Sequence, residues 1–257
     1  MQAELCSPAS LDPEFFSSHP GVAVAVVAGD GGKVGSVAAY LEQPGQAVIY
    51  ERWVTGPPQC WRLAFDKLLG ELRRLNVRVV RAGTTRPVLR NWYERELGMS
   101  VWRELVRYER DLGGSHPSHD RRRGPAAIRP AVLERDRGAL EAIWRAAPDH
   151  PSITALEDLA RLFPARFAVA DLHGAVCGYC FSYVENGVGC LKSVIVAPAK
   201  RGRGIGRQLV ADAVAWFDEL RVPSFLNTEV GNPVTHGLYT SFGYRRAGSF
   251  VVLERSL

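Results

Sequence analysis

The stretch VIVAPAKRGRGIGR, residues 194–207, is the part of the sequence that decides the fold. A run rich in β-branched residues ends at Pro198, and an Arg/Gly loop then leads into a pattern that predicts an amphipathic helix over 204–220. Glycines at 202, 204 and 206 let the backbone turn so that its N–H groups converge. Because a helix N-terminus adds partial positive charge, the stretch predicts a phosphate-binding loop. On these residues alone, a glycine-rich turn with a purely structural role stays open.

Two common nucleotide-binding loops do not fit this stretch. No Gly-Lys-Ser/Thr ends it, so it is not a P-loop, and its glycines do not follow the G-x-G-x-x-G spacing of dinucleotide-binding folds. A phosphorylated ligand of another kind is therefore expected.

The elements around the loop follow the order β-α-α-β-β-β-α-β-α-β. Periodicity predicts strands over 127–131, 167–171, 176–184, 188–197, 224–230 and 244–253, and helices over 133–147, 152–163, 204–220 and 233–242. Asn186-Gly187 is a strong signal for a tight hairpin between two of the strands. The fold class expected is α/β, in the sense of an α+β mixed and mostly antiparallel central sheet flanked by helices.

The first half of the chain repeats the later part of this order. Strands are predicted over 22–28, 34–41, 47–54, 77–82 and 101–108, and helices over 60–75 and 87–97. We infer a diverged duplication whose first copy is truncated, with no room before Val22 for the opening β-α-α. The domains expected are 1–112 and 127–257, joined by a Gly/Pro/Ser/His-rich linker over 113–126.

Composition and charge limit the classes of function. The 257 residues are 46% hydrophobic and 23% charged, as in globular proteins, and the longest uncharged apolar run, 21–29, is too short to span a membrane. The net charge of +5 is spread over both halves, and its only basic run, Arg121–Arg123, lies in the linker. This favours anionic small ligands over nucleic acid. Without a signal-peptide pattern, we expect a cytoplasmic protein with no membrane partner.

The five cysteines predict neither a disulfide nor a metal site. Cys177 and Cys180 form a C-x-x-C within a predicted strand, where residues three apart point to opposite faces. No second C-x-x-C or spaced His pair completes a zinc site. We therefore expect free, buried thiols and no metal.

Two motifs resemble those of the GNAT superfamily of acyl-CoA-dependent N-acetyltransferases. Arg201, Gly204 and Gly206 match the family's Arg/Gln-x-x-Gly-x-Gly/Ala after its fourth strand. Downstream, Asn232 and Tyr239, followed by Phe-Gly-Tyr at 242–244, look like the family's Asn…Leu-Tyr…Gly-Phe/Tyr stretch. The resemblance covers 127–257 well and 20–112 weakly, and it implies two tandem GNAT-like domains.

The resemblance implies an acetyl-CoA site in the second half. In the family, the fourth strand splays from the fifth, and main-chain groups in that strand bind the pantetheine arm and polarise the thioester carbonyl. The loop N–H groups hold the pyrophosphate. The cofactor-binding residues implied here are Val194, Ile195, Val196, Arg201, Gly202, Arg203, Gly204, Ile205, Gly206, Arg207 and Asn232.

The resemblance also implies the catalytic acid. Tyr239 is at the position from which the family protonates the departing CoA thiolate, and a role in packing is its alternative. The base that deprotonates the amine is less well defined, since Asn227 is found where some members have a glutamate. Glu229 on the same predicted strand is the candidate, with His236 as a weaker one.

The first copy departs from the pattern at its counterpart of the loop. There the sequence is VTGPPQCW, residues 54–61, and Pro57 and Pro58 remove two N–H donors. Tyr93, in the equivalent helix, is expected to serve only in packing. We therefore expect one active site, in the second half, with the first half as a scaffold.

The function expected is direct transfer of an acetyl group from acetyl-CoA to the primary amine of a small molecule. Two alternatives remain: a protein or peptide amine as acceptor, or a non-catalytic acyl-CoA-binding regulatory module. The chain is expected to be a monomer, with its two domains forming a pseudo-dimer, or a homodimer. The acceptor is expected near 148–151 and Glu185.

Overall fold

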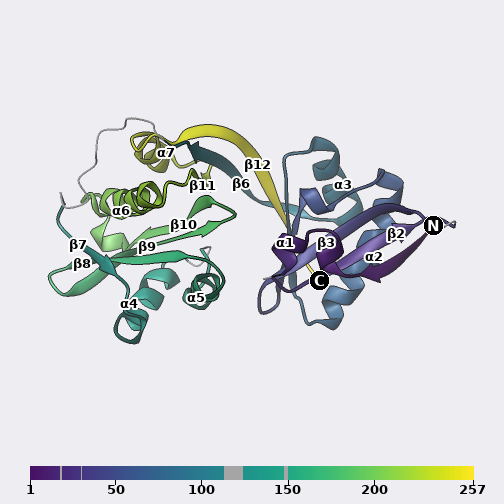
Figure 1. The fold of residues 1–257 in the computed structure, drawn as a ribbon, viewed down its shortest axis with the longest axis horizontal. Coiled ribbons are helices and arrows are strands. Elements are labelled where there is room, and N and C mark those ends of the chain that lie inside the picture. Colours follow the sequence, from purple (N-terminus) through teal and green to yellow (C-terminus); the bar gives the residue numbers. More distant parts are fainter. Residues whose placement is uncertain (18, 30, 113–123, 148–149) are drawn as a thin grey trace. The chain divides into compact units, whose positions relative to one another are not determined.

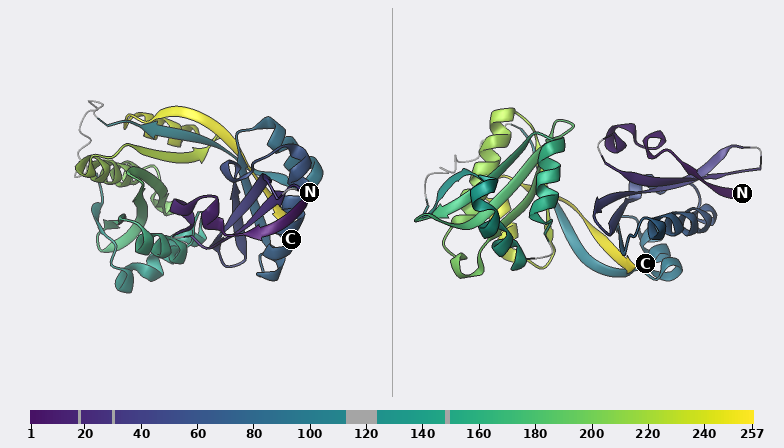
Figure 2. Two further views of the ribbon diagram at one scale, coloured as in Figure 1. Left: turned by 45° about the vertical axis from the view of Figure 1, so that its right-hand side comes forward. Right: turned by 90° about the horizontal axis from the view of Figure 1, so that it is seen from below.

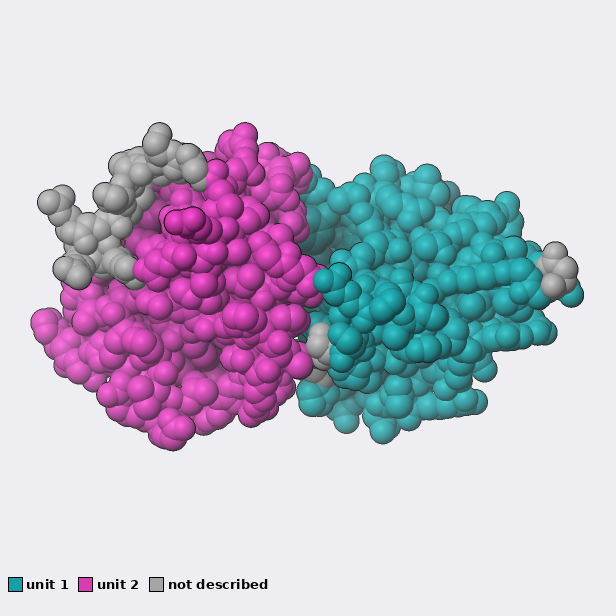
Figure 3. All heavy atoms as spheres, viewed as in Figure 1, with its two compact units in different colours: residues 1–105, 249–257 teal, residues 106–248 magenta. Residues whose placement is uncertain are grey.

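The computed structural model describes residues 1–17, 19–29, 31–112, 124–147 and 150–257 (Figure 1). The chain forms two compact units: unit 1 comprises residues 1–105 and 249–257, and unit 2 comprises residues 106–248 (Figure 3). The expected linker over 113–126 lies outside the described residues from 113 to 123, including the basic run at 121–123.

Unit 1 is built on a sheet of order β1-β2-β3-β4-β5-β12, in which β4 and β5 are parallel. Its strands are β1 (Gln2–Cys6), β2 (Gly21–Val27), β3 (Lys33–Gln43), β4 (Gln46–Tyr50), β5 (Val79–Thr84) and β12 (Arg245–Ser256), together with the start of β6 (Ser100–Arg110). Its helices are η1 (Pro8–Ser10), α1 (Pro13–Phe16), η2 (Glu51–Trp53), α2 (Pro58–Arg74) and α3 (Pro87–Leu97).

Helices cover both faces of this sheet (Figure 2, right). On one face α2 and α3 bury an apolar stripe that includes Phe65, Leu68 and Leu89 against the strands. On the other face Phe15 of α1 packs with Tyr40 and Trp53. Each apolar face of the sheet is thereby removed from water, which is the main source of its stability.

The opening of unit 1 differs from the expectation. We predicted no room for a strand and helices before Val22, but β1 pairs antiparallel with β2 over its whole length. The two helices that would follow are reduced to the single turns η1 and α1. Asp12 caps α1 by accepting from the Phe15 N–H at 3.2 Å, and its other oxygen accepts from Trp53 Nε1 at 3.0 Å. The first copy is therefore shortened in its helices and keeps its strands.

Unit 2 has a sheet of order β6-β11-β10-β9-β8-β7, in which only β10 and β11 pair in parallel among the registers that the structure describes. The strands are β7 (Ala127–Pro130), β8 (Ala165–Leu172), β9 (Ala175–Glu185), β10 (Val188–Val196) and β11 (Ser224–Glu229), with the end of β6. The helices are α4 (Leu133–Arg145), α5 (Ile153–Leu162), η3 (Pro198–Lys200), α6 (Ile205–Leu220) and α7 (Pro233–Thr240). The expected mixed α/β fold is confirmed.

The sheet of unit 2 separates two apolar cores. Figure 1 shows α6 on one face of β8–β10 and α4 with α5 on the other. Leu209 and Phe217 of α6 belong to the first core, which we call the α6 core. Leu140 of α4 and Leu156 of α5 belong to the second, which we call the α4/α5 core.

The turns of unit 2 follow their sequence signals. Asn186 and Gly187 have φ of 52° and 73°, the left-handed conformation that a two-residue hairpin requires, so the predicted hairpin between β9 and β10 is confirmed. Ser152 precedes α5 and its hydroxyl accepts from the Ala155 N–H at 3.2 Å, as expected of an N-cap.

Each half of the chain contributes its last strand to the unit formed mainly by the other half. Residues 251–256 of β12 pair antiparallel with β5, and Leu253 is fully buried in the core of unit 1. Conversely, Val106 and Tyr108 of β6 belong to the α6 core of unit 2. Arg110 at the end of β6 also donates to both carboxylate oxygens of Asp218 on α6, at 2.7 and 3.0 Å, and so links β6 to unit 2. The compact units therefore differ from the domains expected at 1–112 and 127–257, because each half takes its last strand from the other.

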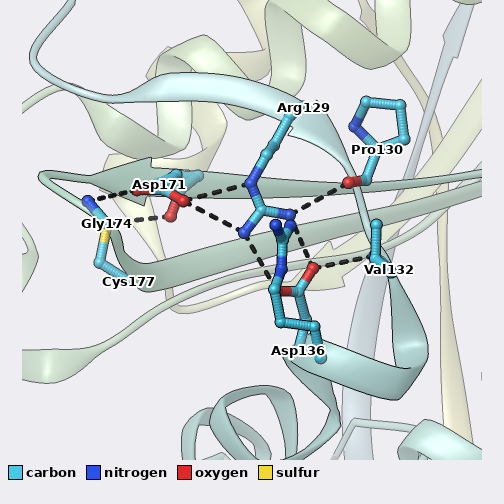
Figure 4. A network of polar contacts seen from close by, with 9 residues as sticks. Arg129, Pro130, Val132, Asp136, Asp171, Gly174 and Cys177 are labelled. Carbon is cyan, nitrogen blue, oxygen red and sulfur yellow. Dashed lines mark hydrogen bonds and ion pairs between the residues drawn. The ribbon is translucent and has the colours of Figure 1, made fainter.

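An ion network fixes α4 to the edge of the sheet (Figure 4). Arg129 on β7 donates to both oxygens of Asp136 at 2.6 and 3.0 Å and also to Asp171 at 3.1 Å. The Asp136 carboxylate also accepts from the Val132 N–H at 2.9 Å. The hydrogen bonds from Arg129 hold the pKa of Asp136 well below its usual range. The network thus joins β7, the first turn of α4 and the end of β8.

Candidate functional site

The strands β10 and β11 separate soon after they meet. Their parallel register covers only two pairs, Gly189 with Ser224 and Cys190 with Phe225. Beyond these, the rest of β10 through Val196 is paired in the described chain with β9 alone. Val194 and Val196 therefore have main-chain groups that face the opening instead of a partner strand. This is the splayed arrangement that the sequence resemblance implies.

The loop after β10 presents unpaired N–H groups. In α6 the first helical hydrogen bond runs from the Gln208 N–H to the Gly204 carbonyl, at 3.1 Å. Among the described residues, no acceptor pairs with the N–H groups of residues 202–207, and α6 has no side-chain N-cap. Together with the helix dipole, these donors can bind an anionic group such as a pyrophosphate.

The three loop glycines differ in conformation and surroundings. Gly202 and Gly204 have φ of 74° and 81°, a conformation that a side chain would strain, although a Cβ there would meet nothing within 4 Å. Gly206 is helical, and its Cβ would lie 3.8 Å from Val196 Cγ2, an ordinary contact. The first two glycines thus shape the turn, and the third leaves the start of the helix uncovered.

The arginines of the loop have distinct surroundings. Arg201 donates from Nε to the Val196 carbonyl at 3.1 Å and so closes the loop onto the end of β10. Arg207 donates to Ser241 Oγ at 3.0 Å, linking α6 to the end of α7. Arg203 is exposed and makes no side-chain interaction with the described residues. A local excess of positive charge remains beside the N–H groups.

Tyr239 lies on α7 and packs into the α6 core, the same core against which Val194 and Val196 pack. It is 8% exposed, and its ring lies 6.4 Å from that of Tyr108 and 6.3 Å from that of Tyr244. Burial raises the pKa of its phenol well above the ordinary value, so the hydroxyl keeps its proton at neutral pH. A protonated phenol can serve as an acid.

The other predicted polar residues differ in their hydrogen bonds and exposure. Asn232 is the N-cap of α7, and its side-chain oxygen accepts from the Thr235 N–H at 3.3 Å. Glu229 is exposed at the end of β11. The His236 ring is in hydrogen-bond contact with the Glu229 carbonyl at 3.0 Å. The structure thus places Glu229 and His236 together but close to solvent.

Two buried hydroxyls were not singled out from the sequence. Tyr179 on β9 and Ser193 on β10 are 0% and 2% exposed, and neither Tyr179 Oη nor Ser193 Oγ has a hydrogen-bond partner in the described chain. Serine and tyrosine within predicted strands look ordinary in a sequence, so no signal was available to find them. Unpaired buried hydroxyls are uncommon because they lose the hydrogen bonds that water would provide.

A cavity of about 410 Å³ lies between α4 and α5. Its lining is largely charged and comprises Leu133, Glu134, Arg137, Glu157, Ala160 and Arg161. Arg137 and Glu157 form an ion pair across it. The acceptor region expected near 148–151 lies outside the described residues at 148 and 149.

The cysteines are free, and four of the five are buried, as expected. The expectation that Cys177 and Cys180 point to opposite faces is wrong, since both pack in the α6 core. The register of β8 and β9 shifts next to Cys177, and this bulge interrupts the alternation of side chains. Burial raises the pKa of Cys180 to about 12, which keeps it a thiol.

Unit 1 has a closed counterpart of the splayed strands. Its β4 and β5 stay paired over five positions, from Gln46 with Val79 to Tyr50 with Gly83. Directly after β4, the Glu51 carboxylate accepts from Thr84 Oγ1 at 2.7 Å and from the Thr85 N–H at 2.8 Å. Pro57 and Pro58 begin the following helix α2. Within the described residues of unit 1, neither the separation of the strands nor the loop of N–H donors seen in unit 2 is repeated.

Among the described residues, no group of three His, Cys, Asp or Glu side chains could hold a metal ion. No helix in the described ranges has the length and apolarity needed to cross a membrane.

Comparisons with known proteins agree with this geometry. The model of the acetyltransferase (GNAT) family matches residues 131–244. No curated protein matches the chain.

Solved structures extend the likeness to most of the chain. A GCN5-related N-acetyltransferase from Sphaerobacter thermophilus is 20% identical, with a TM-score of 0.67 over 91% of this chain and 80% of that one. A tandem GNAT protein from the clavulanic acid biosynthesis pathway is 13% identical, with a TM-score of 0.63 over 93% and 83%. A putative acetyltransferase from Pyrococcus horikoshii is 17% identical, with a TM-score of 0.62 over 97% and 76%.

The family match falls on the half with the splayed strands and the open loop, and the structural likeness covers both halves. Residues 131–244 therefore carry a domain of the acetyltransferase (GNAT) family, and the chain as a whole has the fold of tandem GNAT-like domains.

Proposed function

We propose that unit 2 transfers an acetyl group from acetyl-CoA directly to the primary amine of a small molecule. The observation that carries the proposal is the separation of β10 from β11 directly before a loop of unpaired N–H groups. A long ligand with an extended arm and a pyrophosphate fits these two features together. Acetyl-CoA has both.

We assign acetyl-CoA to the opening between β10 and β11 and to the loop that follows β10. Main-chain groups of Val194 and Val196, with Ile195 between them, bind the pantetheine arm, and an N–H directed at the thioester carbonyl stabilises the oxyanion formed on attack. The N–H groups of residues 202–207 bind the pyrophosphate, and Arg203 adds an unpaired positive charge. Asn232, whose side-chain oxygen caps α7, has its amide group left for the cofactor.

The reaction proceeds by addition and elimination. The amine nitrogen forms a bond to the carbonyl carbon, the C–S bond breaks, and Tyr239 gives its proton to the departing thiolate. The support for this role is that Tyr239 packs in the same core as Val194 and Val196 and keeps its proton at neutral pH. Its raised pKa makes it a weak acid, so transfer to a thiolate requires that the charge develop close to the hydroxyl.

Glu229 is proposed to take the proton of the incoming ammonium through water. Its exposure at the end of β11 gives it access to solvent, to which the proton finally passes. His236, which contacts the Glu229 carbonyl, is the second candidate. Replacing Glu229 with Gln should lower kcat most at low pH, where the amine is protonated and needs a base.

Titration of the protein with acetyl-CoA by calorimetry tests the proposal first. One site per chain is expected, since unit 1 has paired strands and two prolines where unit 2 has the opening and the N–H groups. Two sites would contradict the assignment of unit 1 as a scaffold. Release of CoA is then followed with primary amines and with peptides, which separates a small-molecule acceptor from a protein acceptor.

A non-catalytic module that only binds acyl-CoA is distinguished by Tyr239→Phe. Such a module would bind acetyl-CoA and show no amine-dependent release of CoA in the wild type. An enzyme would show release that falls in the variant while binding persists.

A further inference from the structure

Along strand β10, the face of the sheet to which alternate side chains point changes within the site. Its register against β9 shifts between Leu191 and Ser193, so one residue is added there. Leu191 before the shift packs in the α6 core, whereas Ile195 after it packs in the α4/α5 core. By alternation, Ser193 shares the face of Ile195, and Val194 and Val196 face α6.

This places the two unpaired hydroxyls on one face. Tyr179 belongs to the α4/α5 core, and it is directly opposite Ile195 on the neighbouring strand. Ser193 is two residues from Ile195, so Tyr179 and Ser193 are diagonal neighbours within the reach of a tyrosine side chain. Both hydroxyls are therefore beside the stretch of β10 that has no partner strand on its other edge.

The two faces of the sheet carry different functional groups. The cofactor loop, Tyr239 and the side chains of Val194 and Val196 are associated with the α6 core. With the acid for the departing thiolate on that side, the amine has to approach the carbonyl carbon from elsewhere. On the α4/α5 face, the neutral hydroxyls of Tyr179 and Ser193 lie next to this stretch of β10.

We propose that Tyr179 and Ser193 hold the acceptor amine by hydrogen bonds on the α4/α5 face, and that the acceptor is an amine with an uncharged, aromatic or aliphatic body. The inference rests on the proposed function and names its substrate class. A hydroxyl accepts from an amine N–H and thereby directs the nitrogen lone pair toward the thioester carbonyl. Both are positioning residues, since neither hydroxyl changes its own protonation in the reaction.

The surroundings of the hydroxyls define the body of the acceptor. Side chains around Tyr179 include Phe181, Leu140 and Leu156, all of them apolar, and the Phe167 ring lies 5.7 Å from the Tyr179 ring. A second charge on the acceptor would be left unpaired there at high cost. Neither hydroxyl is exposed, so binding includes a displacement of α4 or α5 from the sheet.

The charged cavity between α4 and α5 would favour the opposite kind of acceptor, one with a second charge. Its Arg137 and Glu157 would suit a charged acceptor such as an amino acid or polyamine. Arg137 and Glu157 pair with each other, whereas the two hydroxyls have no partner in the part of the chain that the structure describes. The hydroxyls are also the groups that lie on β9 and β10. We therefore favour the hydroxyls as the binding groups.

The test compares phenethylamine and tryptamine with lysine and spermidine as probes, by CoA release with acetyl-CoA as donor. The wild type is expected to have a higher kcat/KM for the first two. Tyr179→Phe and Ser193→Ala should each lower kcat/KM for the better amine about tenfold to a hundredfold, with KM and kcat both affected and acetyl-CoA affinity unchanged. The matched control is Tyr93→Phe, which removes a buried, unpaired hydroxyl in unit 1 and should leave turnover unchanged.

Thermal unfolding distinguishes positioning from structure. Because the hydroxyls lack partners, Tyr179→Phe and Ser193→Ala should unfold at the wild-type temperature or above it. A lower melting temperature with unchanged kcat/KM, or a preference for lysine or spermidine, would overturn the inference and leave the proposed function standing. Turnover of none of the four amines or of peptides, with acetyl-CoA bound, would instead overturn the proposed function.

Discussion

The parallel strand pairs β4–β5 and β10–β11 begin alike and end differently. In unit 1 the pair continues over five positions, and Glu51 then joins the end of β4 to Thr84 and Thr85. In unit 2 the pair ends after two positions, and a loop of unpaired N–H groups follows. The same topology therefore gives either a closed or an open pair of parallel strands, depending on a few contacts at the strand ends.

The comparison also explains the two tyrosines on the equivalent helices. Tyr239 on α7 is next to the open pair, and Tyr93 on α3 is fully buried in the core of unit 1. Burial raises the pKa of both phenols. In the proposed mechanism, only Tyr239 gives its proton to a ligand, because β10 and β11 separate in unit 2 whereas β4 and β5 stay paired in unit 1.

The largest effect is expected from Tyr239→Phe. Removing the proton donor should lower kcat about a hundredfold to ten-thousandfold, while acetyl-CoA affinity is kept, because the ring still fills its place in the core. Steady-state kinetics with calorimetry of acetyl-CoA measures both. Unchanged kcat would show that Tyr239 serves only in packing and would remove the functional difference between the two tyrosines.

The next largest effect is expected from Gly206→Pro at the start of α6. Proline removes the backbone N–H of residue 206, just as Pro57 and Pro58 lack this donor in the counterpart loop of unit 1. Removal of one charge-assisted hydrogen bond should weaken acetyl-CoA binding by about 1.5–3 kcal/mol. The matched control is Gly206→Ala, which keeps the N–H and adds a Cβ at an ordinary distance from Val196. Equal affinity of the two variants in calorimetry would mean that this N–H does not contact the cofactor.

A smaller effect is expected from Glu51→Gln in unit 1. Burial alone would raise the pKa of Glu51, but hydrogen bonds from Thr84 and Thr85 outweigh it and lower the pKa. The carboxylate therefore stabilises the fold above the unfolded pKa of about 4.3, and this contribution is lost as the pH falls through the folded pKa. The variant should lose about 1–3 kcal/mol of unfolding free energy at neutral pH and should approach the wild type in acid.

Denaturant unfolding at several pH values measures this difference. Acetyl-CoA affinity should not change, because the contact is in the closed pair. A variant that gained a second acetyl-CoA site would show instead that Glu51 is what keeps unit 1 from binding.

The smallest effect is expected from Tyr93→Phe. The Tyr93 hydroxyl is buried and has no hydrogen-bond partner among the described residues, so its removal should leave the free energy of unfolding unchanged or raise it by up to about 1 kcal/mol. Thermal unfolding measures the change. A clear loss of stability would mean that the hydroxyl has a partner such as a buried water, and that Tyr93 is more than a packing residue.

Local features of this fold were predictable, and pairings between distant segments were not. The helix over 87–97 and the Ser152 cap follow from Pro, Ser and apolar spacing within a few residues. The exchange of β6 and β12 could not be read from periodicity, because a strand carries no mark of which half it pairs with. The strand β1 was missed because its five residues lack a regular alternation.

The site shows the same division. The open loop follows from Gly202 and Gly204, because most other residue types would be strained at the left-handed φ of these positions. The bulge next to Cys177 and the shift at Leu191 decide which face each side chain takes, and neither has a sequence signal. Tyr179 and Ser193 were missed for that reason.

The placement of β12 has a consequence for synthesis of the protein on the ribosome. Residues 249–257 complete the sheet of unit 1, yet they are made after the whole of unit 2. The core of unit 1 stays without Leu253 and its partner strand for β5 until the whole of unit 2 has been synthesised. Unit 1 should therefore be the last to reach its native state, although most of it emerges first, and a chain truncated before residue 249 should expose the edge of β5 to aggregation.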